Sequence, residues 1–343
     1  SVSRSPQSGN ETLYSPRPPS APRHPARGAV VTPTELPVTW RAAMENRREH
    51  FDLADPDQCL RLLHAEDESL RCDRFGKVCW FYRYPSSDSG QGGSPPYGAL
   101  TSAAGARHWH VHDMYDRGGN PHARRHASSV DAPDAWCASE NGLRFELRAD
   151  SGQSPGLFLD QRNNRAWVRR HAEGARILNL FAYTGGFGIA ALAGGATQVV
   201  QVDVSRVYLD WARTNAALNG IDDERTEYSG VDARLFVDGC HRRGRRFEGV
   251  VCDPPSFGRG RRRSTRVFRV EDDLPELVHS CARLVDPGGW VLVSSNYEGW
   301  TQTRFEAAVA GAWATVEPAP GAGDDYRVAD AEPLLKSCIL RVS

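Results

Sequence analysis

The sequence predicts an α/β protein whose C-terminal part is a parallel sheet with helices on both faces. Apolar segments typical of buried strands recur at 177–181, 198–202, 247–251 and 290–294. Segments with helical apolar spacing alternate with them, and a Gly-rich turn follows the first strand. Upstream, short apolar stretches are separated by Gly, Ser and Pro, which favours a smaller N-terminal α+β domain. Together these patterns indicate a Rossmann-like sheet with an appended small domain.

We expect three regions along the chain. Residues 1–38 are rich in Ser, Pro and Arg and lack apolar periodicity, which predicts a disordered tail. Helical apolar spacing from Trp40 to about Leu63 opens the small domain, which we place at 39–150. The Rossmann-like domain then covers 151–343.

Composition excludes several classes of protein. The chain of 343 residues has a formal net charge of −1, so any basic surface for nucleic acid must be local. No apolar run reaches about 18 residues, the length that spans a membrane. The eight cysteines include no CxxC pair, which indicates a reducing compartment. We therefore expect a cytoplasmic protein without a membrane span, as a monomer or a homodimer.

The turn after the first predicted strand has the features of a nucleoside-binding loop. Its glycines at 185–186 let the backbone approach a ligand, and the next helix offers free N–H groups. Asp203 ends the second strand, where a carboxylate can accept both hydroxyls of a ribose. Asp232 follows the third strand and is placed to meet an adenine amino group. Ser205 can cap the helix after Asp203.

The strand at 247–251 leads into the candidate reaction site, Cys252-Asp253-Pro254-Pro255-Ser256-Phe257. Two prolines stiffen the turn and remove two backbone donors, which leaves carbonyls free to accept hydrogen bonds. An acid, rigid carbonyls and an aromatic ring can hold a planar base by its edge and its face. Alternation along the strand points Cys252 away from the side that Asp253 faces, so we interpret it as a core thiol.

With these motifs the chain resembles the bacterial 23S rRNA methyltransferases that modify cytosine C5 and the related enzymes that modify guanine N7. The resemblance runs from about Trp40 to the end and is strongest at Phe158-Leu159-Asp160-Gln161-Arg162 and at the Asp-Pro-Pro segment. It implies a class I methyltransferase fold, S-adenosylmethionine as cofactor and an RNA base as substrate. The cofactor contacts predicted from the motifs and the resemblance are Phe158, Arg162, Asn179, Phe181, Tyr183, Thr184, Gly185, Asp203, Ser205, Asp232 and Asp253.

One departure from the resembled cytosine enzymes bears on the reaction. Cytosine C5 is not nucleophilic, so its methylation needs a thiolate that adds at C6. In those enzymes the cysteine lies in the loop after the fifth strand, where this chain has Asn296. The sequence therefore favours direct transfer, as in the guanine-N7 relatives. The predicted catalytic residues are Asp253, Pro254, Phe257 and Asn296.

Two arginine clusters flank the Asp-Pro-Pro strand. We interpret them as phosphate contacts to RNA beside the catalytic edge, and a solvated loop is the alternative. The members are Arg242, Arg243, Arg245 and Arg246 before the strand, and Arg259, Arg261, Arg262 and Arg263 after it.

The three imidazoles at His108, His110 and His112 are expected on a polar strand face or an exposed loop, and we predict no metal site. Three other functions stay open: a cytosine-C5 rRNA methyltransferase, a small-molecule methyltransferase on the same fold, and a non-catalytic RNA-binding relative that keeps the cofactor.

Overall fold

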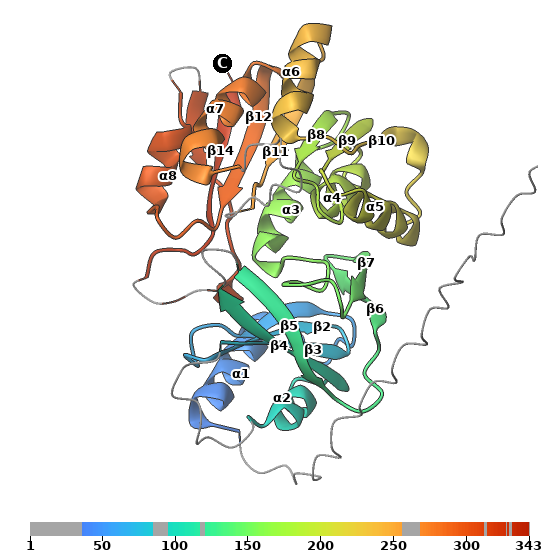
Figure 1. Ribbon diagram of the computed structural model, residues 1–343, viewed down its shortest axis with the longest axis vertical. Helices are drawn as coiled ribbons and strands as arrows, with labels where there is room; N and C mark the ends of the chain where they lie inside the picture. Colours follow the sequence, from blue (N-terminus) through green and yellow to red (C-terminus); the bar gives the residue numbers. More distant parts are fainter. Residues whose placement is uncertain are drawn as a thin grey trace, which may run out of the picture. The chain divides into compact units, whose positions relative to one another are not determined.

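The computed structural model describes residues 36–84, 95–116, 121–255, 268–311, 314–326, 328 and 331–342. Their strands form sheets of seven, five and two strands. The predicted α/β fold class is confirmed, because the larger sheet contains the expected parallel strands with helices between them (Figure 1). Residues 1–35 of the predicted tail at 1–38 lie outside the described residues, and α1 already begins at Val38.

The N-terminal region is built on the five-stranded sheet. Helix α1 (Val38–His50) packs on it through Trp40 and Met44, and the short helix α2 (Tyr97–Ala103) packs through Leu100. The strands, which neighbour each other in chain order, are β1 (Cys59–Leu63), β2 (Leu70–Phe75), β3 (Val78–Arg83), β4 (His108–Asp116) and β5 (Pro121–Ser128).

The prediction of one helix from Trp40 to about Leu63 is wrong after His50. The carboxylates of Asp52 and Asp55 accept the backbone N–H groups two residues further on, from Ala54 and Asp57. Such Asx turns compete with helical hydrogen bonds, and they separate α1 from β1.

The seven-stranded sheet has the order β10-β9-β8-β11-β12-β14-β13. Its first five strands pair in parallel, whereas β14 is antiparallel to both of its neighbours. The chain order reverses between β8 and β11, and ligands bind at the carboxyl ends of strands at such a point. The bounds are β8 (Arg176–Leu180), β9 (Gln198–Val202), β10 (Thr226–Ser229), β11 (Phe247–Cys252), β12 (Val285–Ser295), β13 (Ala314–Pro318) and β14 (Lys336–Val342).

Helices cover both faces of this sheet (Figure 1). Alternate residues of each central strand enter different cores; for example Ile177 packs on one face of β8 and Leu178 on the other. Burial on both faces explains why these strands are continuous apolar runs. The helices on one face are α3 (Arg162–Arg170), α4 (Gly186–Ala193) and α5 (Arg206–Leu218), and those on the other are α6 (Ala233–Arg243), α7 (Val270–Ala282) and α8 (Gln302–Val309).

Smaller elements connect the two large sheets. The hairpin of β6 (Ala135–Glu140) and β7 (Leu143–Arg148) shares a core with α4 and α5. A 3₁₀ turn, η1 (Leu159–Gln161), precedes α3, and another, η3 (Asp324–Tyr326), precedes β14. Residues Pro33–Ser343 form one compact unit, so the domain boundary at 150 stays a prediction.

The imidazoles of β4 differ from the expected polar strand face. His110 and His112 are fully buried, and the His112 ring stacks on Trp80 with ring centroids 3.8 Å apart. Their Nε2 atoms hydrogen-bond the carbonyls of Pro133 and Ala149. Within the described ranges no cluster of His, Cys, Asp or Glu could hold a metal ion. No helix in those ranges is long and apolar enough to cross a membrane.

Candidate active site

The loop between β8 and α4 has a backbone that requires its glycine. Gly185 is the N-cap of α4 and has φ +85°, and a Cβ there would lie 2.8 Å from the Cβ of Ala212 on α5. Phe181 and Tyr183 also have positive φ, 56° and 50°, a conformation that costs energy for residues with side chains. This strained loop therefore needs support from its surroundings.

Three buried side chains support the loop from below. Thr184 Oγ1 donates to the carbonyl of Gly156 at 2.6 Å, and Asn215 Nδ2 donates to the carbonyl of Thr184 at 3.1 Å. Asn179 Nδ2 donates to Gln201 Oε1 at 2.7 Å inside the sheet. Thr184 and Asn179 are each 1% exposed, so they position the loop from beneath its surface.

Asp203 is held directly beside this loop, at the carboxyl end of β9. Its Oδ2 accepts the backbone N–H of Tyr183 at 3.0 Å, and its Oδ1 accepts that of Ser205 at 2.8 Å. Ser205 lies at the N-cap of α5, but its side chain makes no capping hydrogen bond, which corrects the prediction of a side-chain cap. The backbone of Ser205 instead orients the acid.

A small cavity opens between this loop, the segment before α3 and Asp253. The half-exposed ring of Phe158 packs against Tyr183 with ring centroids 5.3 Å apart. The structure thus brings together six of the predicted site residues, which line the cavity or adjoin it: Phe158, Phe181, Tyr183, Thr184, Gly185 and Asp253.

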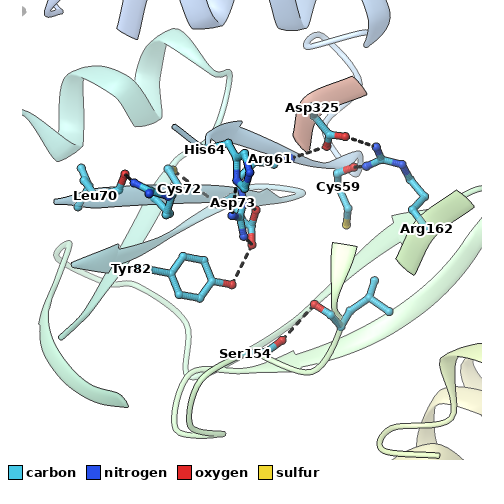
Figure 2. A network of polar contacts seen from close by, with 12 residues as sticks. Cys59, Arg61, His64, Leu70, Cys72, Asp73, Tyr82, Ser154, Arg162 and Asp325 are labelled. Atoms are coloured by element: carbon cyan, nitrogen blue, oxygen red, sulfur yellow. Dashed lines mark hydrogen bonds and ion pairs between the residues drawn. The ribbon is translucent and has the colours of Figure 1, made fainter. Parts of the chain in front are cut away.

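Arg162 lies elsewhere, contrary to its predicted place at the cofactor. Its Nη2 pairs with Asp325 Oδ1 at 2.6 Å, and its Nη1 donates to the carbonyl of Cys59 (Figure 2). Arg165, one helical turn further along α3, lines the cavity instead and is paired with Glu140 at 2.7 Å. The two arginines are one turn of α3 apart, and the sequence alone did not show which of them lines the cavity.

Two exposed valines, which the sequence analysis did not consider, lie next to the strand-end acids Asp203 and Asp232. Asp232 caps α6 by accepting the N–H of Arg234 at 2.9 Å and also pairs with its guanidinium. Val204 follows Asp203 and Val231 precedes Asp232, and they are 58% and 42% exposed. Exposed apolar side chains beside two strand-end acids suit the faces of a flat ring. Their position next to the acids is the sequence feature that could have identified them.

Asp253 forms the centre of a hydrogen-bond cluster at the end of β11. Its Oδ1 accepts from Ser294 Oγ at 2.7 Å and from Gln161 Nε2 at 2.8 Å. Burial raises the pKa of Asp253 to about 6, against the opposing hydrogen bonds from Ser294 and Gln161. The carboxyl is therefore mainly ionised at neutral pH and is held as an acceptor. Pro254, the next residue, is buried, and Phe257 lies outside the described residues.

A cleft of about 590 Å³ adjoins the reaction site. Asn296 lies on its wall and is exposed, and Asp160 and Phe158 line it from the segment before α3. The cleft wall also includes Gly321 and Tyr326 from the segment before β14. Its size is within the range of pockets that enclose a small organic molecule or a flipped base.

A polar cluster on the five-stranded sheet forms another part of this wall, and sequence analysis did not identify it. Arg61 Nε pairs with Asp73 Oδ1 at 2.6 Å, and the Tyr82 hydroxyl donates to the other oxygen of Asp73 at 2.8 Å (Figure 2). The Arg61 guanidinium lies over the ring of Tyr326, 4.5 Å from its centroid. Arg61, Tyr82 and Tyr326 all line the cleft.

The first arginine cluster is not beside the catalytic edge, which corrects that prediction. Arg245 pairs with Glu227 at 2.8 Å and Arg246 with Asp286 at 3.0 Å, at the beginning of β11. Asp253 follows the other end of this strand, roughly 20 Å away at about 3.3 Å per residue. Residues before a parallel strand lie at its amino edge, so Arg242 and Arg243 also lie far from the site. The second cluster, Arg259, Arg261, Arg262 and Arg263, lies outside the described residues.

A doubly wound sheet with a glycine loop, a strand-end acid and an Asp-Pro-Pro turn defines a nucleoside-dependent group-transfer enzyme. Residues 98–299, more than half of the chain, match the family described as S-adenosylmethionine-dependent methyltransferase. The chain belongs to this family of enzymes, and S-adenosylmethionine is its cofactor.

Two curated relatives confirm the predicted resemblance to large-subunit rRNA methyltransferases. Ribosomal RNA large subunit methyltransferase K of Neisseria meningitidis is 39% identical over 165 residues, 48% of this chain and 46% of the relative. Ribosomal RNA large subunit methyltransferase I of Aeromonas salmonicida is 38% identical over 173 residues, 50% and 43% of the two chains. The chain thus spans about half the length of the curated relatives it matches.

Solved structures show the same fold. SMU.776, described as a methyltransferase in complex with SAH, superposes with a TM-score of 0.72 at 21% identity, over 90% of this chain and 84% of that one. A SAM-dependent methyltransferase from Agrobacterium tumefaciens gives a TM-score of 0.61 at 21% identity, over 83% and 90%. These similarities confirm the Rossmann-like methyltransferase fold.

Proposed function

We propose that this enzyme methylates a base of RNA, within large-subunit rRNA, by direct transfer from S-adenosylmethionine and without a cysteine nucleophile. The observation that carries this proposal is the doubly hydrogen-bonded carboxyl of Asp253, which lines the small cavity beside the glycine loop. The similarity to ribosomal RNA large subunit methyltransferases K and I supports RNA as the substrate class.

The residues at the cavity fit S-adenosylmethionine. Asp203 accepts the ribose hydroxyls, Val204 and Val231 contact the adenine faces, and Asp232 lies at the adenine edge. Gly185 lets the loop turn into α4 close to α5, because a side chain there would meet Ala212. Arg165 replaces Arg162 as the guanidinium at the cavity. Thr184 and Asn179 bind Gly156 and Gln201 through their side chains, and Ser205 binds Asp203 through its backbone N–H.

The groups that line the cleft support the proposal of direct transfer. Among the described residues none of the lining side chains is a cysteine, and Asn296 stands where a thiolate would be needed. A hydrogen bond with Cys281 and burial raise the pKa of Cys252, which therefore stays a neutral core thiol. Guanine N7 has its own lone pair and needs no covalent activation, so we favour it as the methylated atom.

S-adenosylmethionine supplies the electrophilic methyl group when it is bound. The protein's contribution is mainly to position the base. Asp253 accepts an N–H of the base, the carbonyls of the Pro254 turn accept a second polar hydrogen, and Asn296 contacts the base from the loop after β12. Phe158 shields the cavity from water beside the transferring group.

The test is methyl transfer by the purified chain to isolated large-subunit rRNA with labelled S-adenosylmethionine, followed by nuclease digestion. The expected product is 7-methylguanosine, with transfer lowered at least tenfold in Asp253→Asn. If 5-methylcytidine is the sole product, the direct-transfer mechanism is wrong.

A small-molecule methyltransferase is the second candidate, because a cleft of about 590 Å³ can also enclose a free metabolite. The same assay separates the two functions when an RNA-free extract of small molecules replaces the rRNA. Label in the extract and none in RNA would replace the RNA proposal with this one.

A further inference from the structure

A buried chain of amide groups connects the wall of the cleft to the carboxyl of Asp253. The backbone N–H of Gly321 donates to Asn164 Oδ1 at 3.0 Å, and Asn164 Nδ2 donates to Gln161 Oε1 at 2.7 Å. Gln161 Nε2 then donates to Asp253 Oδ1 at 2.8 Å. Asn164 is fully buried and Gln161 is 3% exposed, so water does not replace these partners.

The backbone N–H of Gly321 fixes the direction of every hydrogen bond along this series of amide groups. A backbone N–H can only donate, so Asn164 must present its carbonyl oxygen to Gly321 and its NH₂ group to Gln161. Gln161 must then present its oxygen to Asn164, which leaves its NH₂ group facing Asp253. The amide that faces the reaction-site carboxyl is therefore always a donor.

Ser294 reinforces the same arrangement from β12. Its hydroxyl donates to Asp253 Oδ1 at 2.7 Å, and its oxygen accepts the second hydrogen of Gln161 Nε2 at 3.0 Å. Both hydrogen bonds that the described residues donate to Asp253 converge on Oδ1, so we assign Oδ2 to a substrate N–H.

We propose that Gln161 and Asn164 are positioning residues that hold Asp253 as a hydrogen-bond acceptor and link it to the cleft wall at Gly321. The effect of these two residues on catalysis rests on the proposed function, because that effect assumes that Asp253 binds the base. The link itself rests only on the hydrogen bonds.

Several other groups face Asp253 and act on its protonation. The negative charge of Asp160 on η1 raises the pKa of Asp253. Arg165 on α3, although paired with Glu140, lowers the pKa of Asp253. Cys252 on β11 is neutral, and the hydrogen bonds from Ser294 and Gln161 lower the pKa. Burial and Asp160 raise the pKa of Asp253, and the hydrogen bond from Gln161 opposes them. Loss of this hydrogen bond should therefore raise the pKa of Asp253.

The test measures the titration of the Asp253 carboxyl by carbon NMR in the full chain, with Asp253→Asn to assign the signal. Gln161→Met removes the donor, and the midpoint should rise from about 6 by about one unit. Asn164→Asp keeps the acceptor for Gly321 but has no NH₂, so Gln161 rotates its oxygen towards Asp253. This variant should raise the midpoint at least as much.

Asn163→Asp is the matched control, because it makes the same substitution one residue earlier on α3. It adds the same charge at a partly exposed position outside the amide chain, so its midpoint should rise less than that of Asn164→Asp. Retained binding of S-adenosylmethionine shows that each variant is folded. Equal midpoints in the Asn163 and Asn164 variants, or no rise in Gln161→Met, would overturn the proposal.

Activity separates this inference from the proposed function. If the enzyme methylates RNA, the acid limb of its kcat/KM profile should shift upward in Gln161→Met with the NMR midpoint, while activity above about pH 8 recovers. Shifted midpoints in a protein that methylates no RNA would keep the positioning role and refute the RNA proposal. RNA methylation with unshifted midpoints would refute the positioning role alone.

Discussion

Replacing Asp253 with Asn should stabilise the folded protein at neutral pH. The pKa of Asp253 rises in the folded protein from the ordinary 3.8 to about 6, mainly through burial. A carboxyl with a raised pKa favours folding when it is protonated, and that contribution is lost as the pH rises through 6. The shift of about two units corresponds to at most roughly 3 kcal/mol of unfolding free energy above pH 6. Asn avoids this loss and keeps an oxygen for Ser294 and Gln161.

Urea unfolding of wild type and Asp253→Asn at about pH 4.5 and about pH 8 measures this effect, provided that both transitions are two-state. The stability gain of the variant should be larger at the higher pH, by about 2 kcal/mol, while methyl transfer is lost. The prediction is wrong if the variant is less stable than wild type at pH 8, or if its stability gain is equal at both pH values. Either result would mean that burial does not raise the pKa of Asp253 in the folded protein.

Three further predictions concern the cofactor loop, a buried ion pair and the arginine clusters. Gly185→Ala should lower the melting temperature and abolish calorimetric binding of S-adenosylmethionine, because its Cβ would lie 2.8 Å from a methyl group of α5; unchanged affinity would contradict this. Asp325→Asn should cost about 3 kcal/mol in urea unfolding by leaving the buried charge of Arg162 unpaired, and a loss below about 1 kcal/mol would show that the pair is dispensable. Neutralising 261–263 should lower the salt dependence of RNA binding by about 3 in slope, whereas neutralising 242–243, at the far edge, should not; equal effects would refute the placement.

The central sheet and the cofactor loop were predictable because their physical requirements are local. A strand buried on both faces must be a continuous apolar run, and a tight turn beside a helix must contain a glycine such as Gly185. Asp203 became a candidate for the same reason, since it follows such a strand directly. Its hydrogen bonds to two backbone N–H groups were not visible in the sequence.

Partners distant in the sequence could not be predicted. Arg162 pairs with Asp325, 163 residues later, and no local pattern indicates that choice over the cofactor. The cleft wall around Arg61 and the amide chain from Gly321 to Asp253 likewise depend on three-dimensional proximity.

Two errors had local causes. Arg242 and its neighbours precede a parallel strand, so chain direction alone places them at the amino edge, away from the site. The helix expected up to Leu63 was contradicted by Asp52 and Asp55, whose spacing favours Asx turns.

Nucleoside mass spectrometry of large-subunit rRNA shows directly whether this enzyme methylates guanine N7 in RNA. RNA from cells that lack the gene is compared with RNA from cells that carry the wild-type chain or Asp253→Asn. The account predicts that one 7-methylguanosine disappears without the gene and returns with the wild-type chain only. Loss of a 5-methylcytidine, or an unchanged set of modified nucleosides, would contradict it.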